Sequence, residues 1–93
     1  MGRVTPFELS GLDLWFNSGD HLPPHFHAER PGDWEVRVLF LRDPSEMIEV
    51  RWQSRKPKAK TLRRLCELAE QHRERLWAEW EAAVAVTTPG PAR

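Results

Sequence analysis

Hydrophobic and polar residues alternate along several short stretches in the first half of the chain. The clearest is Trp34–Phe40, where Trp34, Val36, Val38 and Phe40 fall on one face. A period of two residues is typical of a strand with one buried face. Similar patterns predict strands over residues 12–16, 25–29 and 47–52, with a short edge strand over Val4–Leu9. Clusters of Asn, Ser, Gly, Asp and Pro between them predict turns.

From Lys58 to about Val84 the hydrophobic period becomes helical. The residues on this stripe are Leu62, Leu65, Ala69, Leu76, Trp80 and Val84. Strands followed by a helix are the order expected of an α+β domain. We therefore predict an antiparallel sheet of three to five strands with one long C-terminal helix across one face. A single domain is expected over residues 1–86, and residues 87–93 (TTPGPAR) are expected to form a flexible tail.

Alternation also predicts what the two faces of the sheet carry. The helix is expected to cover the face of Phe26 and Val36, with Trp52 on that apolar side. The opposite face would combine imidazole, carboxylate, guanidinium and indole groups, from Trp15, His25, His27, Glu29, Glu35, Arg37, Glu49 and Arg51. Such a face is either a binding surface or the solvated side of an antiparallel sheet.

Three of the four histidines fall in the stretch His21–His27, read HLPPHFH. The two prolines favour an extended arm that leads into the following strand. Residues two apart on a strand share a face, so His25 and His27 are expected side by side, away from the helix. The fourth histidine, His72, lies on the helical stripe and is expected to face the sheet, as a core residue or beside Asp20 at its end.

The histidine stretch admits two kinds of chemistry. Imidazoles suit Zn, Ni, Cu or Fe, so His21, His25 and His27 are candidate metal ligands, with Glu29 or Asp20 as a carboxylate. Alternatively, His25 and His27 with Glu29 form a candidate acid–base site, for example for RNA cleavage, in which Arg37 or Arg51 stabilises the transition state. No Ser or Cys nucleophile motif and no Gly-rich phosphate loop is present.

Charge is segregated although the formal net charge is zero. Residues 51–66 contain seven bases and no acid, whereas residues 1–50 contain nine acids and four bases. A basic block of this kind is either solvated surface or a site for the phosphates of RNA or DNA. Its candidate binding residues are Arg51, Arg55, Lys56, Lys58, Lys60, Arg63 and Arg64.

Composition also bears on the cellular compartment. No apolar run approaches the ~20 residues that span a bilayer, and no export signal is recognisable near Met1. The single Cys66 cannot form an internal disulfide and fits a core position on the helix. We therefore expect a cytoplasmic protein without membrane association.

The stretch Asp20–His27, the strand before it and the late helix containing Glu67–Leu76 and Trp80 resemble a small bacterial family. This is a domain of unknown function, the four-one-six-zero family, with a D-H-x-P-P-H-F-H core and a late H-R-x-x-L segment. The resemblance covers roughly residues 12–82. It implies genes found beside partners of another family, in pairs that look like toxin–antitoxin modules, and no established activity. The resulting hypothesis is an accessory protein of toxin–antitoxin type that binds a protein encoded nearby and also RNA or DNA. The alternative is a histidine-dependent enzyme or a transition-metal-binding protein.

Overall fold

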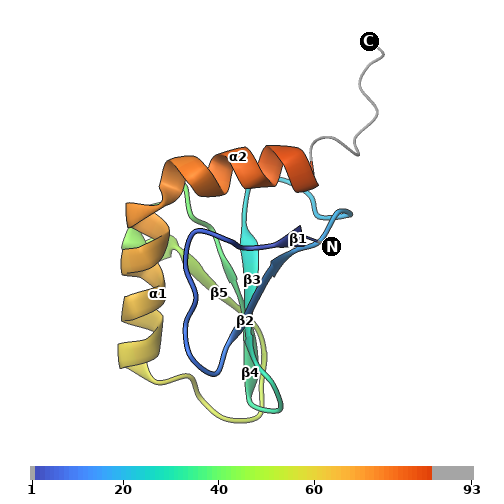
Figure 1. The fold of residues 1–93 in the computed structure, drawn as a ribbon. Helices are drawn as coiled ribbons and strands as arrows, with labels where there is room; N and C mark the ends of the chain where they lie inside the picture. The colour runs from blue at the N-terminus through green and yellow to red at the C-terminus, as the bar shows by residue number, and fades with distance from the viewer. Residues whose placement is uncertain (1, 85–93) are drawn as a thin grey trace.

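Five antiparallel strands form one sheet in chain order. The computed structural model describes residues 2–84. The strands are β1 (Gly2–Arg3), β2 (Asp13–Phe16), β3 (Phe26–Arg30), β4 (Trp34–Val38) and β5 (Ile48–Gln53) (Figure 1). Each pairs with its sequence neighbour, so short turns connect most of them. The predicted α+β class and the four main strands are confirmed, with ends shifted by one or two residues.

The predicted edge strand over Val4–Leu9 is wrong. The Val4 amide still donates to the Leu14 carbonyl at 3.2 Å, but the chain then leaves the sheet. Pro6 offers no backbone donor to continue a ladder. Instead, Phe7 is buried and packs edge-on against Phe26, with ring centroids 5.9 Å apart. This segment closes one side of the core, and the edge strand is the much shorter β1.

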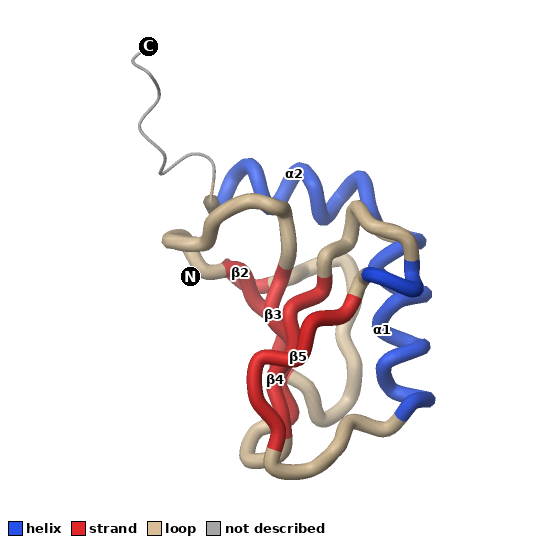
Figure 2. Tube along the Cα trace, turned by 180° about the vertical axis from the view of Figure 1, so that it is seen from behind, coloured by secondary structure: helices blue, strands red, loops and turns tan. Residues whose placement is uncertain are grey.

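The predicted single helix is two helices, α1 (Ala59–Gln71) and α2 (Arg73–Ala83). The helical backbone breaks at His72, where φ is −112° and ψ is 24°. The His72 ring stacks on Phe7 at 5.4 Å, and the next residue, Arg73, donates from Nε to the Phe40 carbonyl at 2.7 Å. These tertiary contacts redirect the chain without Pro or Gly, which is why the sequence did not reveal the break. α1 runs along one side of the sheet and α2 crosses its end (Figure 1; Figure 2, from behind).

The core lies between the sheet, the two helices and the segment after β1. From the strands and the loop after β4 it receives Phe16, Phe26, Val36, Val38, Phe40 and Met47, all essentially inaccessible to solvent. The helices contribute Leu65, Leu68, Ala69, Leu76 and Trp80. The predicted facing of Phe26 and Val36 is therefore correct. None of the described helices is long and apolar enough to cross a membrane.

A β-bulge changes the facing of Trp52. The register passes from Val36↔Val50 to Glu35↔Trp52, so Arg51 is an extra residue on β5. Trp52 consequently reaches the polar side, where its Nε1 donates to Glu35 Oε1 at 3.3 Å. The prediction that Trp52 faces the core is wrong because strict alternation cannot anticipate a bulge. The predicted tail, residues 87–93, lies outside the described residues.

Candidate functional site

His25 and His27 lie together at the end of the sheet that α2 crosses. Their ring centroids are 5.1 Å apart, and His25 also contacts Trp80 of α2 at 5.5 Å. His25 is 3% exposed and His27 is 1% exposed. The expectation that both occupy an open sheet face is therefore wrong. His25 precedes β3 and packs against α2, while the Asn17–Asp20 turn folds beside His27.

Two carboxylates contact opposite edges of the His27 ring. Nε2 lies 2.9 Å from Asp20 Oδ2, and Nδ1 lies 3.1 Å from Glu35 Oε2. The ring also stacks on Trp15, with centroids 5.2 Å apart and planes 16° from parallel. Trp15 is directly opposite His27 in the β2–β3 pair, so the sheet register places the indole there. The result is a histidine fixed in position, orientation and plane.

A hydrogen-bond chain indicates which nitrogen of His27 carries the proton. Trp15 Nε1, which can only donate, contacts Asn17 Oδ1 at 3.1 Å. The amide nitrogen of Asn17 therefore faces His27 Nε2, 3.2 Å away, and donates to it. His27 Nε2 thus accepts, and Nδ1–H donates to Glu35. An unprotonated nitrogen then lies 2.9 Å from the carboxylate of Asp20, and this pair of acceptors calls for a cation between them.

His25 has one satisfied nitrogen and one without a partner. Nδ1 donates to the carbonyl of Pro23 at 2.8 Å, which leaves Nε2 as the lone-pair atom. Nε2 lies 3.4 Å from Asp20 Oδ2, is inaccessible to solvent and has no hydrogen-bond partner among the described residues. Buried polar atoms without partners are rare and mark sites where something is bound.

Asp20, His25 and His27 meet the geometric requirement for a shared metal ion. Each offers a ligand atom, and these atoms all lie within 4.8 Å of one another. The outer nitrogens of the two imidazoles bond to a carboxylate and to a backbone carbonyl. Such partners orient the ligand nitrogens of metal-binding histidines and raise their basicity.

Electrostatics favour the neutral form of His25. Burial lowers the pKa of His25 below its usual value, although the Pro23 carbonyl and Asp20 act in the opposite direction. The neighbouring His27 and Arg37 lower the pKa of His25 further. Neutral imidazole is the form that ligates metal ions.

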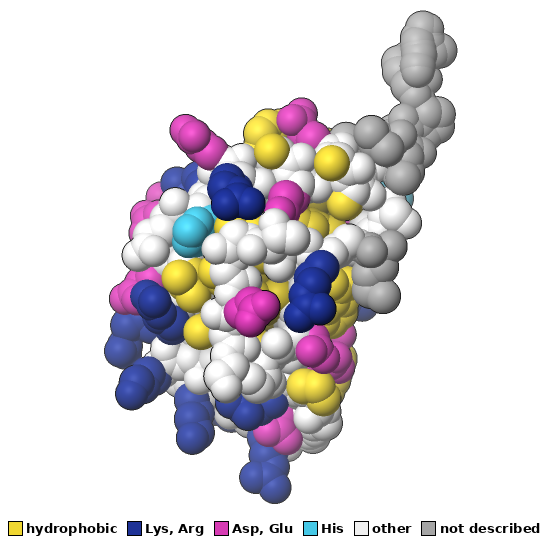
Figure 3. All heavy atoms as spheres, viewed as in Figure 1, with side chains coloured by type: hydrophobic (Ala, Val, Ile, Leu, Met, Phe, Trp, Pro, Cys, Tyr) yellow, Lys and Arg dark blue, Asp and Glu magenta, His cyan; other side chains and the backbone are white. Residues whose placement is uncertain are grey.

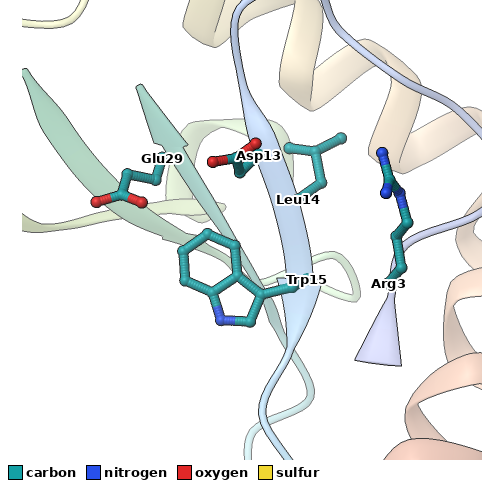
Figure 4. A pocket seen from close by; sticks show the side chains of 5 residues that line it. All are labelled: Arg3, Asp13, Leu14, Trp15 and Glu29. Atoms are coloured by element: carbon teal, nitrogen blue, oxygen red, sulfur yellow. The ribbon is translucent and has the colours of Figure 1, made fainter. Parts of the chain in front are cut away.

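The structure separates the other predicted site residues from this cluster. His21 is exposed and lies outside the ligand group. Glu29 faces Asp13 and Glu35 across the strands, whereas the carboxylates on His27 come from Asp20 and Glu35. Glu29 instead lines an open hollow of about 490 Å³ with Arg3, Asp13, Leu14 and Trp15 (Figure 4). His72 is likewise apart, stacked on Phe7.

Two predicted guanidinium groups lie on the polar sheet face near Glu35. Arg51 Nε is 3.8 Å from Glu35 Oε2, and Arg37 Nη1 is 3.6 Å from Glu49 Oε1. Both arginines are thus engaged with carboxylates of the same face. The acid–base trio His25, His27 and Glu29 is not assembled as predicted, because the carboxylates that contact the imidazoles are Asp20 and Glu35.

The predicted basic block is exposed along its whole length. Dark blue side chains follow α1 and the loop before it (Figure 3). Three of its members contact acids: Arg51 with Glu35, Arg55 with Asp33, and Arg64 with Glu67. The other four have no acidic partner within the described residues: Lys56, Lys58, Lys60 and Arg63. The block begins at the end of the sheet opposite α2, so it is separate from the histidine cluster (Figure 1).

Sequence reasoning missed some members of the cluster. Alternation had placed Glu35 on the same face as His27, and the register now explains its role. Asn17, Trp80 and the Pro23 carbonyl carried no signal, because a turn residue, a helical tryptophan and a backbone oxygen acquire these contacts only through folding.

The family description "Domain of unknown function (DUF4160)" matches residues 12–81. The chain belongs to this family. The matched region contains Asp20, His25, His27 and Glu35, as well as both helices up to Glu81. No curated protein and no solved structure matches the chain.

Proposed function

We propose that this DUF4160 protein binds a divalent transition-metal ion through His25, His27 and Asp20. The observation that carries the proposal is the buried, unpartnered Nε2 of His25, which lies beside the Asp20 carboxylate. A metal ion would supply the positive charge that these acceptor atoms lack. It would also tie the arm before β3 to the Asn17–Asp20 turn.

The donor set narrows the choice of metal. Two imidazole nitrogens and one carboxylate oxygen are the protein ligands of zinc sites that keep a position open for water or substrate. The same set occurs in non-haem iron sites. Closed structural zinc sites normally use several cysteines, and Cys66 contacts the Pro44 carbonyl instead. Zn²⁺ is therefore the first ion to test, with Fe²⁺ as the second.

Isothermal titration with Zn²⁺ tests the proposal. We expect one ion per chain for the wild type. Asp20→Asn keeps the shape of the side chain, removes the charged ligand and should abolish tight binding. Glu35→Gln leaves the three ligands in place and should weaken binding by about 10–100-fold, as expected when a ligand's supporting partner is lost.

A matched control is Glu29→Gln. Glu29 is a half-buried carboxylate on the same strand as His27, outside the ligand group, so binding should not change. Stoichiometric binding that survives Asp20→Asn, or the absence of binding to the metal-free wild type, would contradict the proposal. In the second case, acid–base chemistry by His27 between Asp20 and Glu35 would become the leading alternative.

A second candidate function, binding of nucleic acid, is favoured by the four basic residues without acidic partners. We infer that Lys56, Lys58, Lys60 and Arg63 contact the phosphates of RNA or DNA. Replacing all four with Ser should weaken binding to single-stranded RNA and reduce its dependence on salt. The same variant should retain the wild-type Zn²⁺ titration, and binding unchanged at every salt concentration would remove the block from consideration.

The accessory role in a toxin–antitoxin pair stays a prediction from the family resemblance. It requires a protein partner encoded nearby. Co-expression with the product of the adjacent gene, followed by co-purification, tests it independently of metal and nucleic acid. A neighbour that neither co-purifies nor changes the effect of this protein on cell growth would contradict it.

A further inference from the structure

Strand β5 leaves one side of the sheet open. It is last in the strand order, and β4 is its only strand partner in the described structure. Every residue from Glu49 to Gln53 is exposed, and Val50 retains 51% of its accessible surface. The opposite edge, β1, has only two residues. Proteins usually protect such an edge with Lys or Pro, and β5 contains neither.

The phase of the backbone hydrogen bonds shows which groups of β5 point outward. The Leu39 amide donates to the Met47 carbonyl at 2.7 Å, so these two residues form a hydrogen-bonded pair. Hydrogen-bonded and non-hydrogen-bonded pairs alternate along an antiparallel ladder. Following the register back, Arg37↔Glu49 is hydrogen-bonded and Val36↔Val50 is not. The N–H and C=O groups of Val50 therefore face away from β4.

The sequence around Val50 is complementary to itself. A two-fold axis at Val50 would place Glu49 of one copy opposite Arg51 of the other, and this pairing occurs twice. Both side chains are exposed, 53% for Glu49 and 42% for Arg51. The outward N–H and C=O of Val50 would bond to those of the second Val50. The bulge ends the regular part of the edge after Arg51, so the contact centres on Val50.

We propose that two copies of this chain dimerise by antiparallel pairing of their β5 strands across Val50, which joins the two sheets into one. The occupant of the edge is a second copy because the charge pattern Glu49-Val50-Arg51 matches its own reversal. Opposite charges directly across an antiparallel pair are stabilising, and like charges are destabilising. The proposal is independent of the metal site, which lies on other strands.

Charge reversal tests the register. Sedimentation velocity of the full chain should show a dimer that dissociates on dilution. Glu49→Arg and Arg51→Glu each create two like-charge pairs and should weaken the dimer by at least about tenfold, or roughly 1.4 kcal/mol. The double variant restores complementarity and should recover the dimer. Glu81→Arg, an exposed charge reversal on α2, is the control and should change nothing.

Cross-linking gives a second readout in a Cys66→Ser background. In a hydrogen-bonded antiparallel pair the two Cα atoms lie about 5.5 Å apart, within the range of about 4.4–6.8 Å that a disulfide spans. Val50→Cys should therefore form a covalent dimer on mild oxidation, and Glu49→Cys should not. A monomer at all concentrations, a dimer indifferent to both charge reversals, or cross-linking at position 49 in preference to 50 would overturn the proposal.

Discussion

Replacing Phe26 with Ala measures how far the fold depends on the residue between the two site histidines. Phe26 is inaccessible to solvent, and its ring meets three others: Phe7 at 5.9 Å, Phe16 at 6.4 Å and Phe40 at 6.3 Å. These neighbours come from three separate segments, so the cavity cannot close by moving one of them. The free energy of unfolding should fall by about 3–5 kcal/mol.

That loss is large for a protein of this size. A chain of 93 residues is expected to have a total stability of roughly 5–14 kcal/mol. The melting temperature should therefore fall by on the order of 15–30 °C. Urea unfolding followed by tryptophan fluorescence and by circular dichroism gives both the free energy and a check on two-state behaviour.

Leu22→Ala is the control, because Leu22 precedes the same strand and is 75% exposed. Its effect on the free energy of unfolding should stay within about 0.5 kcal/mol. A Phe26→Ala variant that loses less than about 1 kcal/mol would refute the facing of β3. The burial assigned to both adjacent histidines would then be wrong as well.

Three further predictions concern single groups. The His25→Ala, His27→Ala double variant should lose at least about 2 kcal/mol of stability without added metal, because it opens cavities and leaves Asp20 without its imidazole partners; urea unfolding at a wild-type midpoint would contradict this. Burial and the charge of Glu70 raise the pKa of the Cys66 thiol, so at pH 8 it should react with iodoacetamide more slowly in the native than in the urea-unfolded chain, and equal rates would be the contrary result. His72→Ala removes a ring stacked on Phe7 and should cost about 0.5–1.5 kcal/mol in thermal unfolding, whereas a cost above about 3 kcal/mol would show that His72 is a fully buried core residue.

The sequence was sufficient for the sheet because its strands are amphipathic. Val36 and Val38 alternate with Glu35 and Arg37, and only one facing of this strand buries the valines. Phe26 was assigned to the core by the same reasoning. Strict alternation failed at Trp52, where one extra residue in β5 reverses the facing.

The break between the helices depends on contacts that are distant in sequence. Leu65 and Leu76 belong to one helical stripe, and nothing between them has a low helix propensity that would force an end. The chain turns because His72 stacks on Phe7 and Arg73 binds the Phe40 carbonyl. Contacts of this kind cannot be read from local periodicity.

The candidate site was half visible in the sequence. His25 and His27 were identified by their spacing, and Asp20 was considered as a carboxylate partner. Their burial was missed, because alternation assigns residues to faces and does not show that α2 and the Asn17–Asp20 turn will cover one end of the sheet. His21 was chosen for its residue type alone, and it is exposed.

The most direct test of the metal centre is a crystal of the wild-type protein grown with Zn²⁺, with data collected above and below the zinc absorption edge. The anomalous difference map should show one dominant peak within about 2.0–2.2 Å of His25 Nε2, His27 Nε2 and Asp20 Oδ2. A dominant peak at His21 or His72, or no peak at the cluster at saturating Zn²⁺, would contradict the account.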